Sequence, residues 1–355
     1  MRINYTFSAF IGFCVLGLWA CSQENNSLVS KAYHNTTAYY NAYFLADERM
    51  GIVDEKIREN NQDDYNRVLP IFIPMDTTFN NSLKEDLDYA GEKASFPVQF
   101  HKNSKWVDDS YLLLGKVRLY QNKPDLAIQT FRYVNYKSED EPTRHQALYW
   151  LIRIYLDQKQ YTQAQDVVRY LESKELDPKN EKDFHLTMAY YHQELNENKE
   201  ALKHLELAVP QIKEDRDLRS RTNFITAQLH QSFGNDSIAY AYYETALKGT
   251  PPYELTFFTK LNMAQVSSVN DKTELKKIKK YFVKLLKDLK NEEYRDRIYY
   301  EVAKFDLKQG RSDSAFANIT RSIKVESTNP HQKGYTYWLA AVSYTHLTLP
   351  TTPYV

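Results

Sequence analysis

The sequence predicts an all-α protein built as a right-handed solenoid of stacked helix pairs, and three observations support this prediction. The 355 residues include 9 glycines and 29 tyrosines, and so few glycines argue against a turn-dense β-sandwich or Gly-rich phosphate loops. Similar apolar stretches recur at intervals of roughly 37 to 38 residues, which is typical of helical repeats. The composition, 42% hydrophobic and 26% charged, is that of an ordinary globular protein.

The first element predicted is a secretory signal peptide over residues 1–20. Arg2 precedes an apolar run over residues 5–19, which is shorter than the roughly 20 residues that span a bilayer. The run ends in Leu18-Trp19-Ala20-Cys21, which resembles a bacterial lipobox. That resemblance implies lipidation of Cys21 and membrane attachment through residues 21–30 as a tether. A plain secretory signal and an uncleaved anchor are the alternatives.

The region 31–105 is predicted to be helical, with an extended excursion near 63–81. Residues 31–61 and 82–95 have helical patterns, whereas Pro70 and Pro74 flank an apolar stretch between them. The only other cysteine is Cys14, so no disulfide and no thiolate metal site is expected after residue 21.

A repeat array is predicted over residues 106–344. Leu114-Gly115, Ala127 and Phe131 have the L-G…A…F spacing of a tetratricopeptide repeat. Small residues let antiparallel helices approach closely, and they recur at matching positions: Ala164, Ala189, Ala201, Ala227, Ala239, Ala303 and Ala315. The predicted fold class is therefore an all-α, tetratricopeptide-repeat (helix-pair) right-handed solenoid.

The later units depart from the pattern. Residues 254–290 are predicted to form a degenerate unit, whose second helix has a Lys-rich face that is either solvated or binds anionic lipid or an acidic partner. The last unit is predicted to be truncated, because the sequence after Tyr344 lacks a helical period and contains two prolines. Residues 345–355 resemble translated vector or adapter DNA, so a non-native tail is expected; a genuine short tail is the alternative.

No enzyme is predicted. No Ser or Cys nucleophile has a recognisable setting, and no cofactor, small-molecule substrate or metal is expected. His192 and His230 occupy equivalent repeat positions and are interpreted as packed side chains rather than metal ligands. Lys+Arg and Asp+Glu both total 46, and a chain without basic excess gives no indication of nucleic-acid binding.

A candidate partner groove is predicted on the first helices of the repeats, where an apolar stripe has a basic and amide edge. Its residues are Leu112, Lys116, Tyr149, Arg153, Leu186, Phe224, Gln228, Tyr300 and Lys304. Such a stripe suits an extended or helical peptide, but ordinary packing against neighbouring helices explains it equally well.

Four stretches resemble the PorW/SprE lipoproteins of Bacteroidota. They are KAYHNTTAYYNAYFLADE (31–48), DDYNRVLPIF (63–72), KWVDDSYLLLGKVRLY (105–120) and RDRIYYEVAKFDLKQG (295–310). The resemblance implies an outer-membrane lipoprotein, expected to face the periplasm, that serves type IX secretion and gliding motility. The implied partners are ring and translocon proteins of that machinery.

Two other classes of lipoprotein remain as alternatives. A SusD-like nutrient (glycan)-binding lipoprotein also packs helical repeats, but its repeats are interrupted by long loops with exposed aromatic residues. A BamD-like assembly lipoprotein is a shorter chain with few repeats. The proteins recovered with this chain from native outer membranes would distinguish the three.

Overall fold

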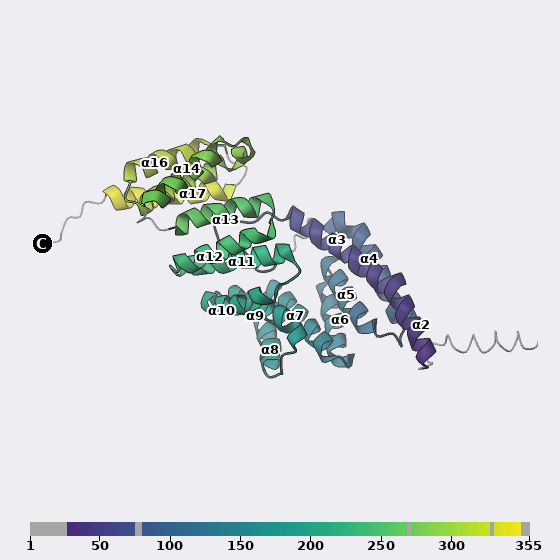
Figure 1. The fold of residues 1–355 in the computed structure, drawn as a ribbon. Helices are drawn as coiled ribbons and strands as arrows, with labels where there is room; N and C mark the ends of the chain where they lie inside the picture. Colours follow the sequence, from purple (N-terminus) through teal and green to yellow (C-terminus); the bar gives the residue numbers. More distant parts are fainter. Residues whose placement is uncertain (1–26, 75–79, 268–271, 327–329, 349–355) are drawn as a thin grey trace, which may run out of the picture. The chain divides into compact units, whose positions relative to one another are not determined.

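The computed structural model describes residues 27–74, 80–267, 272–326 and 330–348 (Figure 1). Throughout these residues every regular element is a helix. The predicted signal peptide, Cys14 and the predicted lipidation site Cys21 lie outside the described residues, as do 349–355 of the predicted tail.

The N-terminal helices match the two predicted helical regions, with longer bounds. They are α2 (Leu28–Ala38), the π-helix η1 (Tyr39–Tyr43), α3 (Phe44–Asn60) and α4 (Asn80–Phe100). Residues 61–74, in the first part of the predicted excursion, form turns, bends and irregular backbone rather than helix.

The repeat region consists of helices joined by short turns. They are α5 (Val107–Tyr120), α6 (Pro124–Lys137), α7 (Glu141–Asp157), α8 (Tyr161–Glu172), α9 (Glu181–Glu194), α10 (Asn198–Ala208), α11 (Arg216–Ser232), α12 (Asp236–Ala246), α13 (Tyr253–Val266), α14 (Lys272–Lys287), α15 (Arg295–Lys308), α16 (Ser312–Lys324) and α17 (Pro330–Thr348). Short 3₁₀ turns precede or follow several of them: Pro178–Asn180, Val209–Gln211, Leu247–Gly249 and Leu289–Tyr294. Sequential helices pack as pairs, α5 on α6, α7 on α8, α11 on α12 and α15 on α16. The predicted all-α, tetratricopeptide-type helix-pair fold is confirmed.

The chain forms two compact units. Unit 1 comprises Met1–Gln62 and Phe72–His204, and unit 2 comprises Asp63–Ile71 and Leu205–Val355. A short segment from early in the sequence, Asp63–Ile71, therefore belongs to the unit that is otherwise built from α11 to α17.

The turn between the two helices of a pair has the same backbone geometry in five repeats. One residue in each adopts a positive φ: Asn122, Lys159, Asn196, Gly234 and Gly310. The next residue donates its backbone N–H to the carbonyl five positions earlier, as in Lys123 to Arg118 and Asn235 to His230. This is the bond that closes a helix in a Schellman motif. Glycine adopts the positive φ at two of the five positions, and asparagine or lysine adopts it at the other three.

Gly115 shows why a small residue is needed where paired helices meet. A Cβ atom built on Gly115 would lie 2.6 Å from the Phe131 ring of the partner helix. Phe131 itself is fully buried. Any side chain at residue 115 therefore forces α5 and α6 apart or displaces the ring.

Gly115→Ala is expected to lower the free energy of unfolding by about 1–2 kcal/mol, because the overlap with Phe131 outweighs the gain in helix propensity. Gly51 of α3 is the matched control, since a Cβ there meets nothing within 4 Å. Gly51→Ala is expected to raise the free energy of unfolding by about 0.5–1 kcal/mol. Urea denaturation measures both, and equal effects would contradict this account.

The C-terminal helices complete unit 2. Tyr300, Ala303, Ile319 and Leu339 form a buried cluster that joins α15, α16 and α17. Helix α17 continues to Thr348, which is beyond the end predicted at residue 344. In the described part of the chain, no helix is both long enough and apolar enough to cross a membrane.

Candidate partner-binding surfaces

In unit 2, the segment Asp63–Ile71 packs against first helices of the repeats. Tyr65 stacks on Phe258 of α13, with ring centroids 3.9 Å apart and planes 11° from parallel, and meets Phe224 of α11 edge-on at 5.6 Å. Its side chain is 6% exposed. The aromatic ring therefore anchors the segment in a slot between α11 and α13.

The backbone of the segment is held by one amide side chain. Gln228 of α11 accepts a hydrogen bond from the Leu69 N–H at 2.9 Å and donates one to the Arg67 carbonyl at 2.7 Å. The Leu69 side chain is fully buried. The Gln228 amide therefore fixes the backbone at residues 67 and 69, directly after the turn in which the Arg67 N–H donates to the Asp64 carbonyl at 3.0 Å.

Charged groups hold both ends of the segment. The Arg221 guanidinium binds both carboxylate oxygens of Asp63, at 2.5 and 3.0 Å, and donates to the Pro70 carbonyl at 3.1 Å. From α15, Arg297 donates to the Tyr65 carbonyl at 3.4 Å. A bidentate guanidinium–carboxylate pair adds geometric specificity to this attachment.

Two residues of the predicted groove, Phe224 and Gln228, thus contact residues 63–71 of this same chain. The others in unit 2 do not contact this segment in this way. Tyr300 lies in the buried cluster of α15 to α17, and Lys304 forms an ion pair with Glu301 at 3.2 Å. Binding of a separate partner by these four residues stays a prediction.

In unit 1, the basic groove residues make internal contacts. Lys116 forms an ion pair with Asp54 at 2.5 Å. The Arg153 guanidinium lies between two rings, 3.7 Å from the centroid of Phe72 and 4.3 Å from that of Trp150, which is favourable cation–π geometry. The apolar members of the stripe in this unit are all buried: Leu112, Tyr149 and Leu186.

Arg221, Phe258 and Arg297 were not among the residues of the predicted groove. A signal for Arg221 was present, because Arg221, Phe224 and Gln228 are spaced by three and four residues and so share one face of α11. Nothing in the local sequence indicated that residues 63–71 cover that face.

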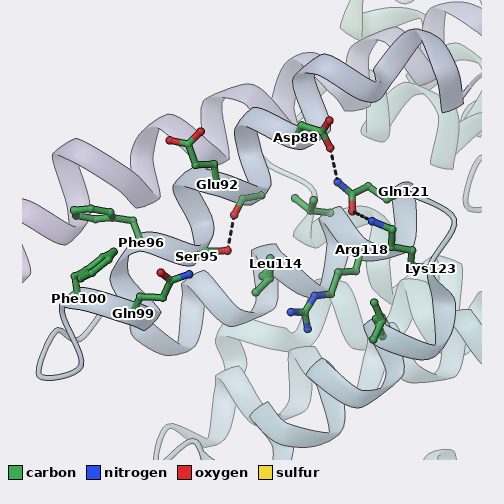
Figure 2. Close-up of a pocket in the computed structure, with 13 residues that line it drawn as sticks. Asp88, Glu92, Ser95, Phe96, Gln99, Phe100, Leu114, Arg118, Gln121 and Lys123 are labelled. Atoms are coloured by element: carbon green, nitrogen blue, oxygen red, sulfur yellow. Dashed lines mark hydrogen bonds between the residues drawn. The ribbon is translucent and has the colours of Figure 1, made fainter.

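Unit 1 also has an open groove of about 510 Å³ between α4, α5 and the start of α6 (Figure 2). Its floor includes the buried Leu114, and the exposed rings of Phe96 and Phe100 stand at one end. At the other end Gln121 donates to Asp88 at 3.0 Å and accepts from Lys123 at 2.9 Å. The mixture of apolar floor and charges of both signs fits a protein surface better than a small anion or cation.

The histidines pack as aromatic side chains. His192 stacks on His204 at 5.5 Å, and His230 stacks on Tyr242 at 5.3 Å. Burial and the neighbouring His185, whose Nδ1 is 2.9 Å from that of His204, lower the pKa of His204 to about 4. Among the described residues, no group of three or more His, Cys, Asp or Glu side chains is arranged to hold a metal ion.

Glu254 of α13 is an acidic side chain close to the docked segment. Burial, together with the charges of Asp63 and Glu293, raises the pKa of Glu254 to about 7. Between about pH 4.5 and 7, Glu254 therefore holds a proton in the folded protein but not in the unfolded chain. The contribution of Glu254 to the free energy of unfolding falls as the pH rises through this range.

We expect Glu254→Gln to remove that dependence. The difference in free energy of unfolding between the variant and the parent should grow in favour of the variant from pH 5 to pH 7.5, since the parent must then bury a charge. Urea denaturation across this range is the measurement. A difference that is constant with pH would show that Glu254 ionises normally in the folded protein.

The chain matches no known protein-family model and no curated protein. Among solved structures, one similar to it is the crystal structure of a tetratricopeptide repeat protein from Parabacteroides merdae ATCC 43184. The two are 13% identical, and the alignment covers 75% of this chain and 96% of that chain with a TM-score of 0.37. The fold assignment rests on the paired helices and repeated turns of this chain itself.

Proposed function

We propose that this protein is a non-enzymatic scaffold that binds partner proteins through its helix-pair repeats. The observation that supports this best is the attachment of Asp63–Ile71. Its aromatic slot, its amide contacts to the peptide backbone and its guanidinium pair together form a peptide-binding surface. The open groove between α4, α5 and α6 offers a second surface of suitable size in unit 1.

We further propose that the scaffold is an outer-membrane lipoprotein of the type IX secretion and gliding machinery, anchored through Cys21 and facing the periplasm. The support is the lipobox-like stretch at residues 18–21 and the four stretches that resemble PorW/SprE lipoproteins. Ring and translocon subunits are the partners that this resemblance implies.

The test for partners is cross-linking in intact cells, followed by affinity purification of the full chain from native outer membranes. Recovery of type IX ring or translocon subunits would support the proposal. A TonB-type transporter would instead indicate the SusD-like nutrient-binding class, and barrel-assembly proteins would indicate a BamD-like protein.

The anchor is tested separately by metabolic labelling with an alkyne fatty acid. Cys21→Ser is expected to abolish labelling and to release the protein from the outer-membrane fraction, because both depend on the acyl chains. The matched control is Cys14→Ser, since Cys14 lies in the same apolar run and is expected to leave labelling unchanged. Labelling that persists in Cys21→Ser would contradict the proposed anchor.

A further inference from the structure

Helix α14 in unit 2 has two contrasting faces. Ile278, Phe282 and Leu285 are buried, and the Phe282 ring lies 5.7 Å from that of Phe305 on α15. The opposite face carries the exposed lysines Lys276, Lys277, Lys279, Lys280, Lys284 and Lys287. At 100° per residue, Lys276, Lys280 and Lys287 lie at the centre of this basic face, directly opposite the buried side chains.

The lysines of the basic face lack acidic partners within the described part of the chain. No Asp or Glu occurs from residue 275 to 287, and the nearby Glu292 forms an ion pair with Arg295 at 3.4 Å. Lys203 on α10, by contrast, is paired with Glu200 at 2.7 Å. The positive charge from residue 276 to 287 is therefore concentrated on one exposed surface, which is flanked in the sequence by Glu274 and Asp288.

One apolar side chain is exposed on the same face of the helix. Val283 lies between the lysines and is 50% exposed. A cluster of exposed lysines on one helical face is the arrangement that binds anionic lipid headgroups electrostatically. Sequence-specific recognition of an acidic protein would instead need shaped pockets and directed hydrogen bonds.

We infer that the basic face of α14 binds the surface of a membrane that contains anionic lipid headgroups. The lysine ammonium groups would lie at the level of the headgroup phosphates, with Val283 directed toward the acyl boundary. This contact is separate from the proposed acylation of Cys21 and from the proposed partner proteins, and neither is needed for it.

The test is flotation of the full chain with vesicles, using Cys21→Ser in every sample so that no acyl chain contributes. Binding is expected to vesicles of 70% phosphatidylcholine and 30% phosphatidylglycerol, and not to phosphatidylcholine alone. Because one basic residue near an anionic surface changes partitioning by about fivefold, the triple variant Lys276→Gln, Lys280→Gln, Lys287→Gln should bind on the order of 100-fold more weakly. Binding should also weaken as salt rises from 0.1 to 0.5 M.

The matched control removes the same charge elsewhere, at three exposed lysines that are not on α14: Lys84→Gln, Lys199→Gln and Lys213→Gln. This control should bind like the parent, and circular dichroism should show both variants folded. The inference is overturned if both triple variants lose binding equally, if neutral vesicles bind as well as anionic ones, or if the chain ignores anionic vesicles but binds polyglutamate through the α14 lysines.

Discussion

Replacing Tyr65 by alanine is expected to release Asp63–Ile71 from unit 2 and to lower the free energy of unfolding by about 3–5 kcal/mol, the range for deleting a buried aromatic side chain. Tyr65 is 6% exposed and stacks on Phe258 at 3.9 Å, so its removal leaves a cavity between α11 and α13. Urea denaturation gives the stability, and hydrogen exchange at the Leu69 amide, which is bonded to Gln228, reports whether the segment has been released.

Tyr65→Phe is the matched control, because it keeps both ring contacts and removes only the hydroxyl. It should cost less than about 1.5 kcal/mol and leave the Leu69 amide protected. Gln228→Leu tests the backbone contacts on their own, and it should cost about 1–3 kcal/mol since it leaves a buried N–H unsatisfied. If Leu69 stays protected in Tyr65→Ala, the ring does not anchor the segment.

The attachment of this segment has a consequence for partner binding. Any peptide that uses Phe224 and Gln228 must first displace residues 63–71. Such a peptide binds only those molecules in which the segment is released, so its apparent affinity falls in proportion to that fraction. Tyr65→Ala should therefore strengthen binding of such a partner, even though it weakens the fold. A partner that binds elsewhere, such as at the groove between α4 and α5, would not respond.

The helix pairs were predictable because the forces that make them are local in sequence. Gly115 and Ala127 are small where two helices must approach, and Phe131 fills the space beside them. The spacing of such residues repeats with the helical period, so the sequence alone indicates both the helices and their pairing. The left-handed turn residue was harder to predict at Lys159, because a lysine at that position gives no indication of positive φ.

The docked segment was not predictable because its contacts join residues far apart in the sequence. Asp63 and Arg221 are 158 positions apart, and the sequence around either residue gives no indication that it contacts the other. An apolar stripe on a helix shows that something covers it, but not whether the cover is a partner or the chain itself. The sequence therefore placed Phe224 and Gln228 on an apolar stripe with an amide edge, and left open whether a partner or the chain itself covers it.

Replacing Glu301 is expected to have the second large effect on the free energy of unfolding, because Glu301 is a fully buried carboxylate with cationic partners. Its oxygens are 2.8 Å from Arg297 and 3.2 Å from Lys304, and Gln265 donates to it at 2.9 Å. Removing one partner of a buried ion pair leaves an uncompensated charge, which typically costs 3–5 kcal/mol. Glu301→Gln is thus expected to lower the free energy of unfolding by about that amount, as measured by urea denaturation at pH 7.

The same group should make the parent sensitive to acid. Burial opposes ionisation of Glu301, but Lys304 and Arg297 outweigh it and hold its pKa below the usual value of 4.5. An acid whose pKa is lower in the folded state stabilises the fold above its unfolded pKa, and this contribution is lost as the pH falls through the folded pKa. The stability difference between the parent and Glu301→Gln should therefore be full at pH 7 and shrink below about pH 4.5.

Lys304→Met is the control, since Lys304 is 38% exposed and an exposed partner should contribute less than about 1 kcal/mol. Equal losses from Lys304→Met and Glu301→Gln, or a difference that does not shrink in acid, would show that the buried Arg297–Glu301 pair does not stabilise unit 2.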